Sequence, residues 1–108
     1  MIRAKKIKLD DLKTERSAAI AKALGHPARI EIIKILMEQN SCFCGDLADV
    51  LPLAQSTVSQ HLKALKDAGL ISGTVDGVRT CYCLNPDGVS ELDNLLSELS
   101  SKLVKTCC

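Results

Sequence analysis

Residues 55–84 read QSTVSQHLKALKDAGLISGTVDGVRTCYCL, and the pattern changes there from helical to β-rich. Apolar residues recur at helical spacing in the first half, which predicts a helix over residues 55–68 with one buried face. That face consists of Val58, Leu62 and Leu65. Gly69 then stands where helices commonly end, because glycine adopts the left-handed backbone of a C-terminal cap without strain.

The second half contains two β-rich runs, residues 70–75 and 78–84, on either side of Asp76-Gly77. This dipeptide is typical of a two-residue hairpin turn, since a type I′ turn needs positive φ at both central positions. Side chains alternate along a strand, so Tyr82 and Leu84 share one face, which we expect to meet the core. Arg79, Cys81 and Cys83 share the other face.

Helical patterns continue on both sides of this unit. One helix is expected from Asp10 or Asp11 to Leu24, and a second begins at Pro27. Their apolar stripes are Leu12, Ala19, Ile20 and Ala23 in the first, and Ile30, Ile33, Leu36 and Met37 in the second. Residues 42–44 form a short extended run, residues 46–51 a brief third helix, and residues 87–105 a leucine-rich last helix.

A short helix, a tight turn, a second helix and a hairpin together predict a winged helix-turn-helix, mainly α with a small β-hairpin wing. The chain is expected to be one such domain, 1–108, with a basic arm at 1–9 and the helix-turn-helix at about 45–68. The wing then covers about 70–84. Hydroxyl, amide and cationic side chains on an exposed helix can contact base edges and phosphates in the major groove. The expected DNA-binding residues are Gln55, Ser56, Thr57, Ser59, Gln60, His61, Lys63 and, on the wing, Arg79. His61 fits a packing role or a phosphate contact.

The last helix, about 87–105, carries more leucines than one flank of a small domain can bury. The first helix, with its alanine-rich stripe, also has no obvious partner within the chain. Pairing of both helices with their copies in a second chain would bury them and place two recognition helices about one DNA turn (~34 Å) apart. We therefore expect a homodimer.

Composition excludes several other classes. The chain has 108 residues with 46% hydrophobic and 25% charged residues, which suits one folded domain. Aromatic residues make up only 2%, so the chain has too few aromatic side chains to form a base-stacking platform or an aromatic cage. A net charge of +1 shows that any DNA-binding surface must be local. The charged N-terminus and the lack of a long apolar run predict a cytoplasmic protein. We do not expect an enzyme, because the sequence contains no set of acid–base or nucleophilic residues other than the thiols.

Six cysteines occur as three close pairs, Cys42/Cys44, Cys81/Cys83 and Cys107/Cys108. We expect thiols rather than a secreted disulfide framework, because the chain carries long helical patterns and no export signal. Closely spaced thiols suit a soft metal ion or redox chemistry. Some of these cysteines could instead be small buried hydrophobic residues.

Four segments of the chain resemble the ArsR/SmtB family of bacterial metalloregulators. They are LGHPAR at 24–29, CFCGDLA at 42–48, QSTVSQHL at 55–62 and AGLI at 68–71. The resemblance extends over residues 12–106. It implies a dimeric winged-helix repressor that releases operator DNA when it binds a metal or metalloid, or when a thiol pair is modified.

The resemblance also implies where a ligand could bind. Zinc sensors of the family use histidines in the last helix, but His26 and His61 lie outside it, so that site is absent. Arsenic and cadmium/lead sensors use a Cys-x-Cys beside the DNA-binding helices, which Cys42 and Cys44 match. The arsenic type adds a third cysteine three residues on, where this chain has Leu47.

Two other cysteine pairs could complete this site. Cys107-Cys108 resembles the C-terminal ligand pair of other family members. In winged helices the segment before the helix-turn-helix commonly pairs with the second wing strand, which would bring Cys81 and Cys83 beside Cys42 and Cys44. A four-thiol cluster of this kind would suit cadmium, lead or zinc, and an exposed pair without a ligand is equally compatible with the pattern.

The sequence thus predicts a homodimeric repressor that responds to trivalent arsenic or antimony, As(III) or Sb(III). Cd(II), Pb(II) and Zn(II) are alternative inducers, and no cofactor is expected for DNA binding. A redox or persulfide switch of the same fold is the second hypothesis. A thiol-rich metal-buffering protein is the third, and DNA binding separates it from the others.

Overall fold

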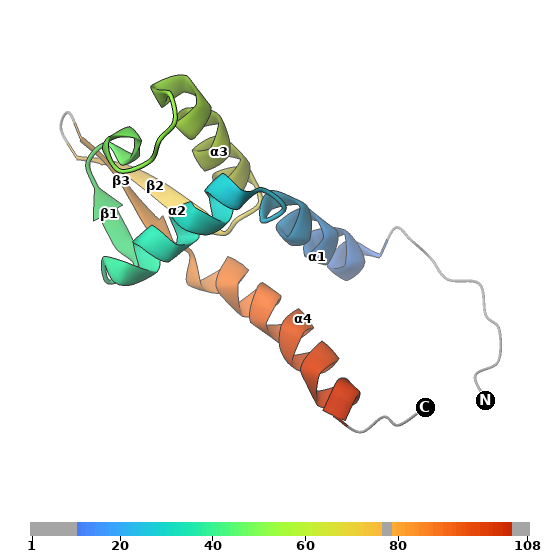
Figure 1. The fold of residues 1–108 in the computed structure, drawn as a ribbon. Helices are drawn as coiled ribbons and strands as arrows, with labels where there is room; N and C mark the ends of the chain where they lie inside the picture. The colour runs from blue at the N-terminus through green and yellow to red at the C-terminus, as the bar shows by residue number, and fades with distance from the viewer. Residues whose placement is uncertain (1–10, 77–78, 105–108) are drawn as a thin grey trace, which may run out of the picture.

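The computed structural model describes residues 11–76 and 79–104. Helices α1 (Leu12–Ala23) and α2 (Pro27–Glu38) lead to strand β1 (Cys42–Cys44) and the 3-10 helix η1 (Leu47–Asp49). Helix α3 (Gln55–Asp67), strands β2 (Ile71–Asp76) and β3 (Arg79–Leu84) and helix α4 (Pro86–Val104) follow (Figure 1). This order confirms the predicted winged helix-turn-helix, although the brief third helix is a single 3-10 turn.

Side chains cap the N-termini of the first two helices, which begin where the sequence predicts. Asp11 accepts a hydrogen bond from the backbone N–H of Lys13 at 3.0 Å and caps α1. Pro27 opens α2, and the Nδ1 of His26 accepts from the backbone N–H of Ala28. Both contacts satisfy backbone donors that have no partner inside a helix.

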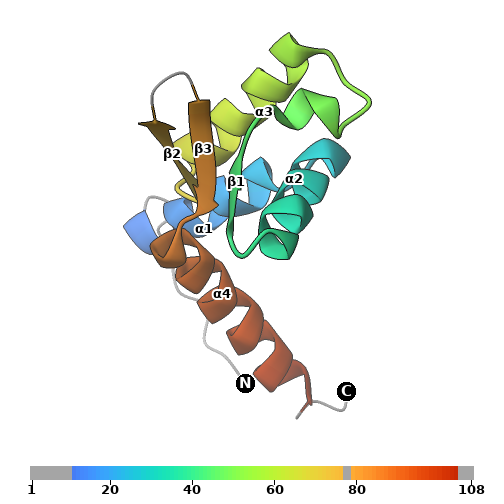
Figure 2. The ribbon, with the colours of Figure 1, turned by 90° about the vertical axis from the view of Figure 1, so that its left-hand side faces the viewer.

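The three strands form one antiparallel sheet in the order β1-β3-β2 (Figure 2). The expected pairing of the segment before the helix-turn-helix with the second wing strand is confirmed, with Phe43 opposite Tyr82. The predicted hairpin turn is displaced by one residue. Asp76 pairs with Arg79, so Asp76 belongs to β2 and the connection is 77–78, outside the described residues.

One aliphatic cluster from α1, α2, η1, α3 and β2 forms the core. Its largest fully buried side chains are Ile20, Ile32, Leu36, Val58, Leu65, Leu70 and Ile71. The buried face predicted for α3 is confirmed, and Tyr82 and Leu84 pack against the core as expected. The face predicted for α2 is partly wrong, because Ile32 is buried while Ile30 and Met37 are exposed. In α1 only Ile20 and Ala23 are buried, and Leu12 and Ala19 are exposed.

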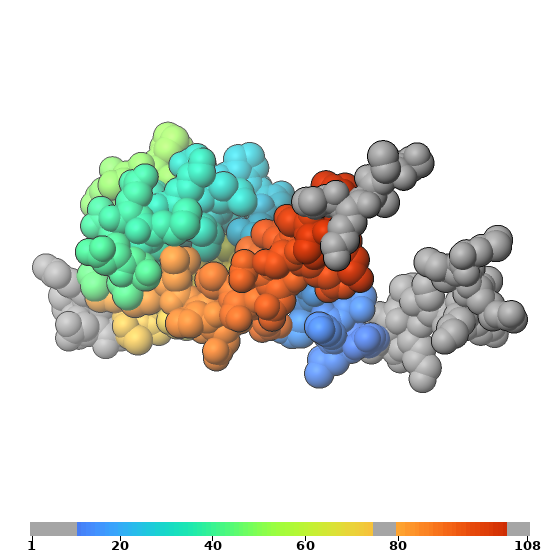
Figure 3. Space-filling model, turned by 90° about the horizontal axis from the view of Figure 1, so that it is seen from below, coloured from blue at the N-terminus to red at the C-terminus, as the bar shows by residue number. Residues whose placement is uncertain are grey.

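Helix α4 leaves the body of the domain and runs beside α1 (Figure 3). Its first turn is fixed by Gly88, where any side chain would overlap the carbonyl oxygen of Gly69. The Arg16 guanidinium on α1 forms an ion pair with Glu91 at 2.9 Å and donates to the carbonyl oxygen of Ala68 at 3.2 Å. Among the described residues, no helix is both long and apolar enough to cross a membrane.

Candidate DNA-binding face and cysteine cluster

The outer face of α3 presents the polar side chains that the sequence predicts. Val58, Leu62 and Leu65 point inward, which leaves most of the other face exposed. The exposed members are Gln55, Ser56, Ser59, Gln60 and Lys63, and Thr57 is half-buried. This surface can offer hydroxyl, amide and cationic groups to a DNA groove.

His61 does not belong to this exposed face. Only 7% of it is exposed, and its Nδ1 accepts a hydrogen bond from Nε of Arg29 at 3.0 Å. We therefore correct its assignment as a DNA-contacting residue, since it takes the packing role. Burial, together with the nearby His26 and Arg29, lowers the pKa of His61 below its ordinary value.

The start of α3 lacks a conventional cap, because Ala54 offers no side-chain acceptor. The carboxylate of Asp46, just before η1, accepts from the backbone N–H of Ala48 at 2.9 Å and lies beside the side chain of Gln55. With the Gln55 amide oriented so that its nitrogen faces this carboxylate, the amide donates to both carboxylate oxygens, at 2.7 Å and 2.9 Å. Gln55, the first residue of α3, is thereby tied to the segment that follows β1.

Lys63 makes an ion pair with Asp67 one helical turn further along α3. Its Nζ lies 2.8 Å from Oδ2 of Asp67, and both side chains are well exposed. The hydrogen bond and the charge of Asp67 raise the pKa of Lys63, so its ammonium group remains charged and available to a phosphate.

Four cysteines form a cluster on the outer face of the sheet. Cys42 lies opposite Cys83 and Cys44 opposite Cys81, with Cα atoms 4.0 Å and 4.1 Å apart. Each opposing pair is joined by a disulfide. The pairing of the strands brings these four cysteines together as expected, but the expected free thiols are corrected, since each sulfur is bonded to the one on the opposite strand.

The surroundings of this cysteine cluster are open to solvent. Cys42 and Cys44 are exposed, and Cys81 and Cys83 are half-buried. Phe43 and Tyr82 point the other way, into the core. Among the described residues no group of three or more histidine, cysteine or carboxylate side chains stands ready to hold a metal ion, since these sulfurs are bonded to each other.

Two of the predicted ligands, Cys107 and Cys108, lie outside the described residues. Arg79 begins β3, where it pairs with Asp76 of β2. Sequence reasoning missed two further residues, Asp46 and Arg29. An aspartate before a 3-10 turn signals a local cap, but its bond to Gln55 depends on how the turn folds back on α3.

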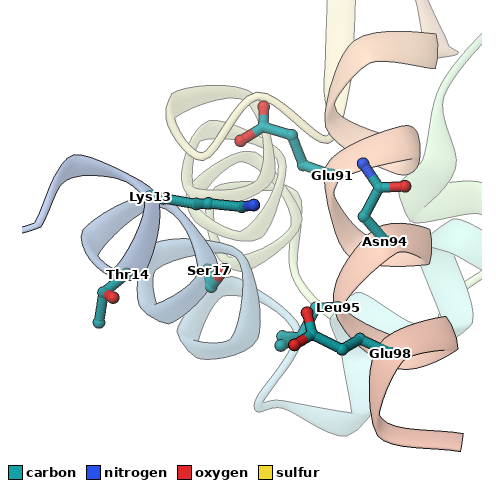
Figure 4. Close-up of a pocket in the computed structure, with 7 residues that line it drawn as sticks. All are labelled: Lys13, Thr14, Ser17, Glu91, Asn94, Leu95 and Glu98. Atoms are coloured by element: carbon teal, nitrogen blue, oxygen red, sulfur yellow. The ribbon is translucent and has the colours of Figure 1, made fainter. Parts of the chain in front are cut away.

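A groove of about 420 Å³ lies between α1 and α4 (Figure 4). Lys13 points across it toward α4, from which Glu91, Asn94 and Glu98 project (Figure 4). The hydrogen bond from Arg16 lowers the pKa of Glu91 and, with its charge, keeps this carboxylate ionised. Leu95 also lines this groove, and the other exposed leucines of α4 are Leu96, Leu99 and Leu103.

Comparison with known proteins gives consistent results. Residues 26–72 match the family model described as the arsR family of bacterial regulatory proteins. An HTH-type transcriptional regulator of Methanocaldococcus jannaschii is 40% identical over 88 residues, which cover 81% of this chain and 98% of that protein. The arsenical resistance operon repressor of Bacillus subtilis is 38% identical over 88 residues, 81% of this chain and 74% of that protein.

A solved structure supports the same assignment. HlyU from Vibrio cholerae is similar with a TM-score of 0.66 at 27% identity, covering 82% of this chain and 96% of that one. These relatives are described as regulators of transcription, which agrees with the prediction that the chain is not an enzyme.

Proposed function

The chain belongs to the ArsR family of bacterial DNA-binding transcriptional regulators, and from this premise we propose how it senses its signal. It represses transcription as a homodimer bound to operator DNA through α3 and the wing. It releases the DNA when trivalent arsenic or antimony binds cysteine thiolates of β1 and β3. The observation that carries this proposal is the position of the cysteine cluster, whose β1 cysteines lie directly before the helix-turn-helix.

The chemistry of the reduced cluster suits a trivalent metalloid. Thiolates are soft ligands, and each As–OH bond of arsenous acid exchanges for an As–S bond while the thiol proton leaves in water. Cys42 and Cys44 supply two sulfurs. The strand register supports Cys81 or Cys83 as the third, since both lie directly opposite, and Cys107 and Cys108 are the alternative third ligand. Cadmium, lead or zinc could use all four sulfurs of the sheet.

A short path connects the cluster to the DNA-reading helix. Cys44 ends β1, and two residues later Asp46 holds the side-chain amide of Gln55 at the start of α3. Gly45 between them has a φ of +141°, so the chain bends sharply at this point. A metalloid that draws the sulfurs together would shift Asp46 and loosen the start of α3. A coupling of about 1–3 kcal/mol is enough for effective release.

The dimer is supported by the two helices that leave the body of the domain. Leu95, Leu96, Leu99 and Leu103 of α4 and Leu12 of α1 are exposed in the single chain. Burial of such side chains against a second copy is favourable at about 25 cal/mol per Å² of apolar surface. A two-fold dimer built on α1 and α4 would leave both α3 helices free to contact DNA.

A second candidate signal is oxidation, and a specific observation favours it. The structure joins the four sulfurs of the sheet as two disulfides, so the oxidised state is geometrically accessible. Two thiols and one hydrogen peroxide give one disulfide and two water molecules. Because disulfide sulfurs do not bind arsenic, the reduced and oxidised proteins should respond differently to arsenite.

An operator titration distinguishes these signals. We would measure binding of labelled operator DNA by fluorescence anisotropy, with protein reduced by a phosphine or oxidised by peroxide, and with or without arsenite or antimonite. We expect arsenite to release DNA from the reduced protein only. Release by peroxide alone would favour the oxidation hypothesis, and indifference to both would refute thiol sensing.

Serine variants identify the ligands. Cys42→Ser and Cys44→Ser should keep DNA binding but lose release by arsenite, since a hydroxyl is a poor ligand for a soft ion. Cys107→Ser and Cys108→Ser serve as matched controls at the other candidate pair. If only these C-terminal variants abolish release, the sensor lies there and our assignment is wrong. X-ray absorption counts the arsenic–sulfur neighbours in each variant.

A further inference from the structure

Three basic side chains meet where α1, α2 and α3 converge, and none of them belongs to the proposed sensor. His61 of α3 is buried, and its Nδ1 accepts a hydrogen bond from Nε of Arg29 on α2 at 3.0 Å. The ring of His26, which caps α2, lies against the ring of His61 with centroids 4.4 Å apart. Buried polar groups that bond to each other in this way restrict how two helices can sit together.

We propose that Arg29 and His61 are positioning residues that hold α3 at the angle required to read operator DNA. The inference rests on the proposed role of α3 as the reading helix. His61 follows Gln60, which is exposed on the DNA-binding face, so a change in how His61 is held moves that face directly.

The Arg29 guanidinium connects three helices at once. While Nε donates to His61 of α3, Nη1 donates to the carbonyl oxygen of Ala23 at the end of α1, at 3.4 Å. Arg29 itself lies in the first turn of α2. A link to both neighbouring helices explains why an arginine, with several donors in a fixed plane, suits this position better than a lysine.

The link requires a neutral His61. In the neutral ring Nδ1 can accept the hydrogen bond from Arg29 only if Nε2 carries the ring hydrogen, which fixes the tautomer. Protonation would place an N–H at Nδ1 against the N–H of Arg29 and add a second positive charge in a buried place. The charged and titratable groups that face His61 are Arg29 and His26, and both oppose its protonation, which agrees with its lowered pKa.

Acidification should therefore break the hydrogen bond between Arg29 and His61 by protonating His61, with no need for a substitution. Above the ordinary histidine value of 6.5 the ring is neutral and α3 is held in place. As the pH falls below that value and passes the lowered pKa of His61, the hydrogen bond is lost and operator affinity should fall. Protonation of exposed neutral histidines near DNA would add positive charge and raise affinity, so the sign of the pH dependence is informative.

The test is an operator titration of the full chain from pH about 8 to about 5, where histidine changes its charge. The variants are His61→Asn, whose side-chain oxygen can accept from Arg29 but does not titrate, and His26→Asn, which keeps a good N-cap. We expect wild-type affinity to fall about tenfold on acidification, as the loss of a hydrogen bond to a charged group would give. His26→Asn should keep this fall, and His61→Asn should abolish it.

Two results would overturn the inference: equal pH dependence in His61→Asn and wild type, or loss of the dependence in His26→Asn alone. Should His61→Asn fail to fold, nitrogen NMR of the wild type follows the same link. The Arg29 Nε–H signal should change with the midpoint at which His61 titrates, and independence of the two would refute the link.

Gln60→Ala in the same titration tests separately whether α3 is the helix that reads operator DNA, on which the positioning role depends. If Gln60 reads a base, this variant should bind operator about 5- to 150-fold more weakly. Normal binding by Gln60→Ala together with normal binding by Lys63→Ala would mean that α3 is not the reader. Weak binding by Gln60→Ala with unchanged pH dependence in His61→Asn would refute only the positioning role.

Discussion

Helices α3 and α4 are both amphipathic, but their apolar faces meet different surroundings. In α3 the buried leucines are 0–6% exposed, since the core of the same chain covers them. In α4, Leu95, Leu96, Leu99 and Leu103 are 39–70% exposed, and exposure increases with distance from the body of the domain. The chain covers the whole apolar face of α3, but it covers only the first part of the apolar face of α4.

This difference indicates what each helix is for. A helix whose apolar face is fully covered can present its polar face rigidly, which a DNA-reading element needs. A helix whose apolar face is largely exposed gains stability from a second surface, and in the proposed dimer a second copy of α1 and α4 would supply one. The predictions below test the two helices against each other.

The largest expected effect comes from truncating one leucine in each helix. Leu65→Ala should reduce the free energy of unfolding by about 2–5 kcal/mol, because it leaves a cavity in a filled core. Leu99→Ala should change the stability of a single chain by no more than about 0.5 kcal/mol. Urea unfolding at low protein concentration measures both.

The same pair of variants tests the dimer. At high protein concentration Leu99→Ala should also become destabilising, because association stabilises the folded state by mass action. Sedimentation velocity should show a weaker dimer for Leu99→Ala. Equal stability of Leu99→Ala and wild type at every concentration, with unchanged sedimentation, would mean that α4 is not the dimer helix.

Much of this arrangement could be predicted from the sequence, since local rules fix it. The buried face of α3 follows from the spacing of Val58, Leu62 and Leu65, and the pairing of β1 with β3 follows from the order of the elements. In α2, by contrast, six closely spaced apolar residues, at 30, 32, 33 and 35–37, allow several faces. Packing against α3, β1 and β3 buries Ile32, which periodicity alone could not identify.

The parts of the site that the sequence missed depend on tertiary contacts. Nothing near Arg29 in the sequence shows that it meets His61, which is far away along the chain. The angular position of His61 on α3 left packing and phosphate contact open, and its burial against α2 decides for packing. The cysteine spacing predicted which sulfurs would be neighbours but not their covalent state.

A moderate effect is expected on the outer face of α3. Lys63→Ala should weaken binding to all DNA sequences and lower the salt dependence of log affinity by about 0.9, as for one lost phosphate contact. Asp67→Asn is the matched variant, because it removes the carboxylate that holds Lys63. It should bind DNA more tightly, although the loss of this exposed ion pair should cost little stability. Anisotropy titrations at several salt concentrations measure these changes, and an unchanged slope in Lys63→Ala would remove this residue from the interface.

The smallest effect is expected at the ion pair between Arg16 of α1 and Glu91 of α4. Arg16 holds Glu91 by two hydrogen bonds, at 2.9 Å and 3.0 Å, and lowers the pKa of Glu91. A carboxylate with a lowered pKa in the folded state stabilises the fold at neutral pH, and this contribution disappears as the pH falls through that pKa. Glu91→Gln should therefore lower the melting temperature slightly at pH about 7, and this difference should shrink as the pH falls through the pKa of Glu91 and the wild-type carboxylate becomes neutral. Glu98→Gln, on the same helix, controls for the lost charge. If both variants shift the melting temperature equally at every pH, net charge rather than the Arg16 contact fixes the start of α4.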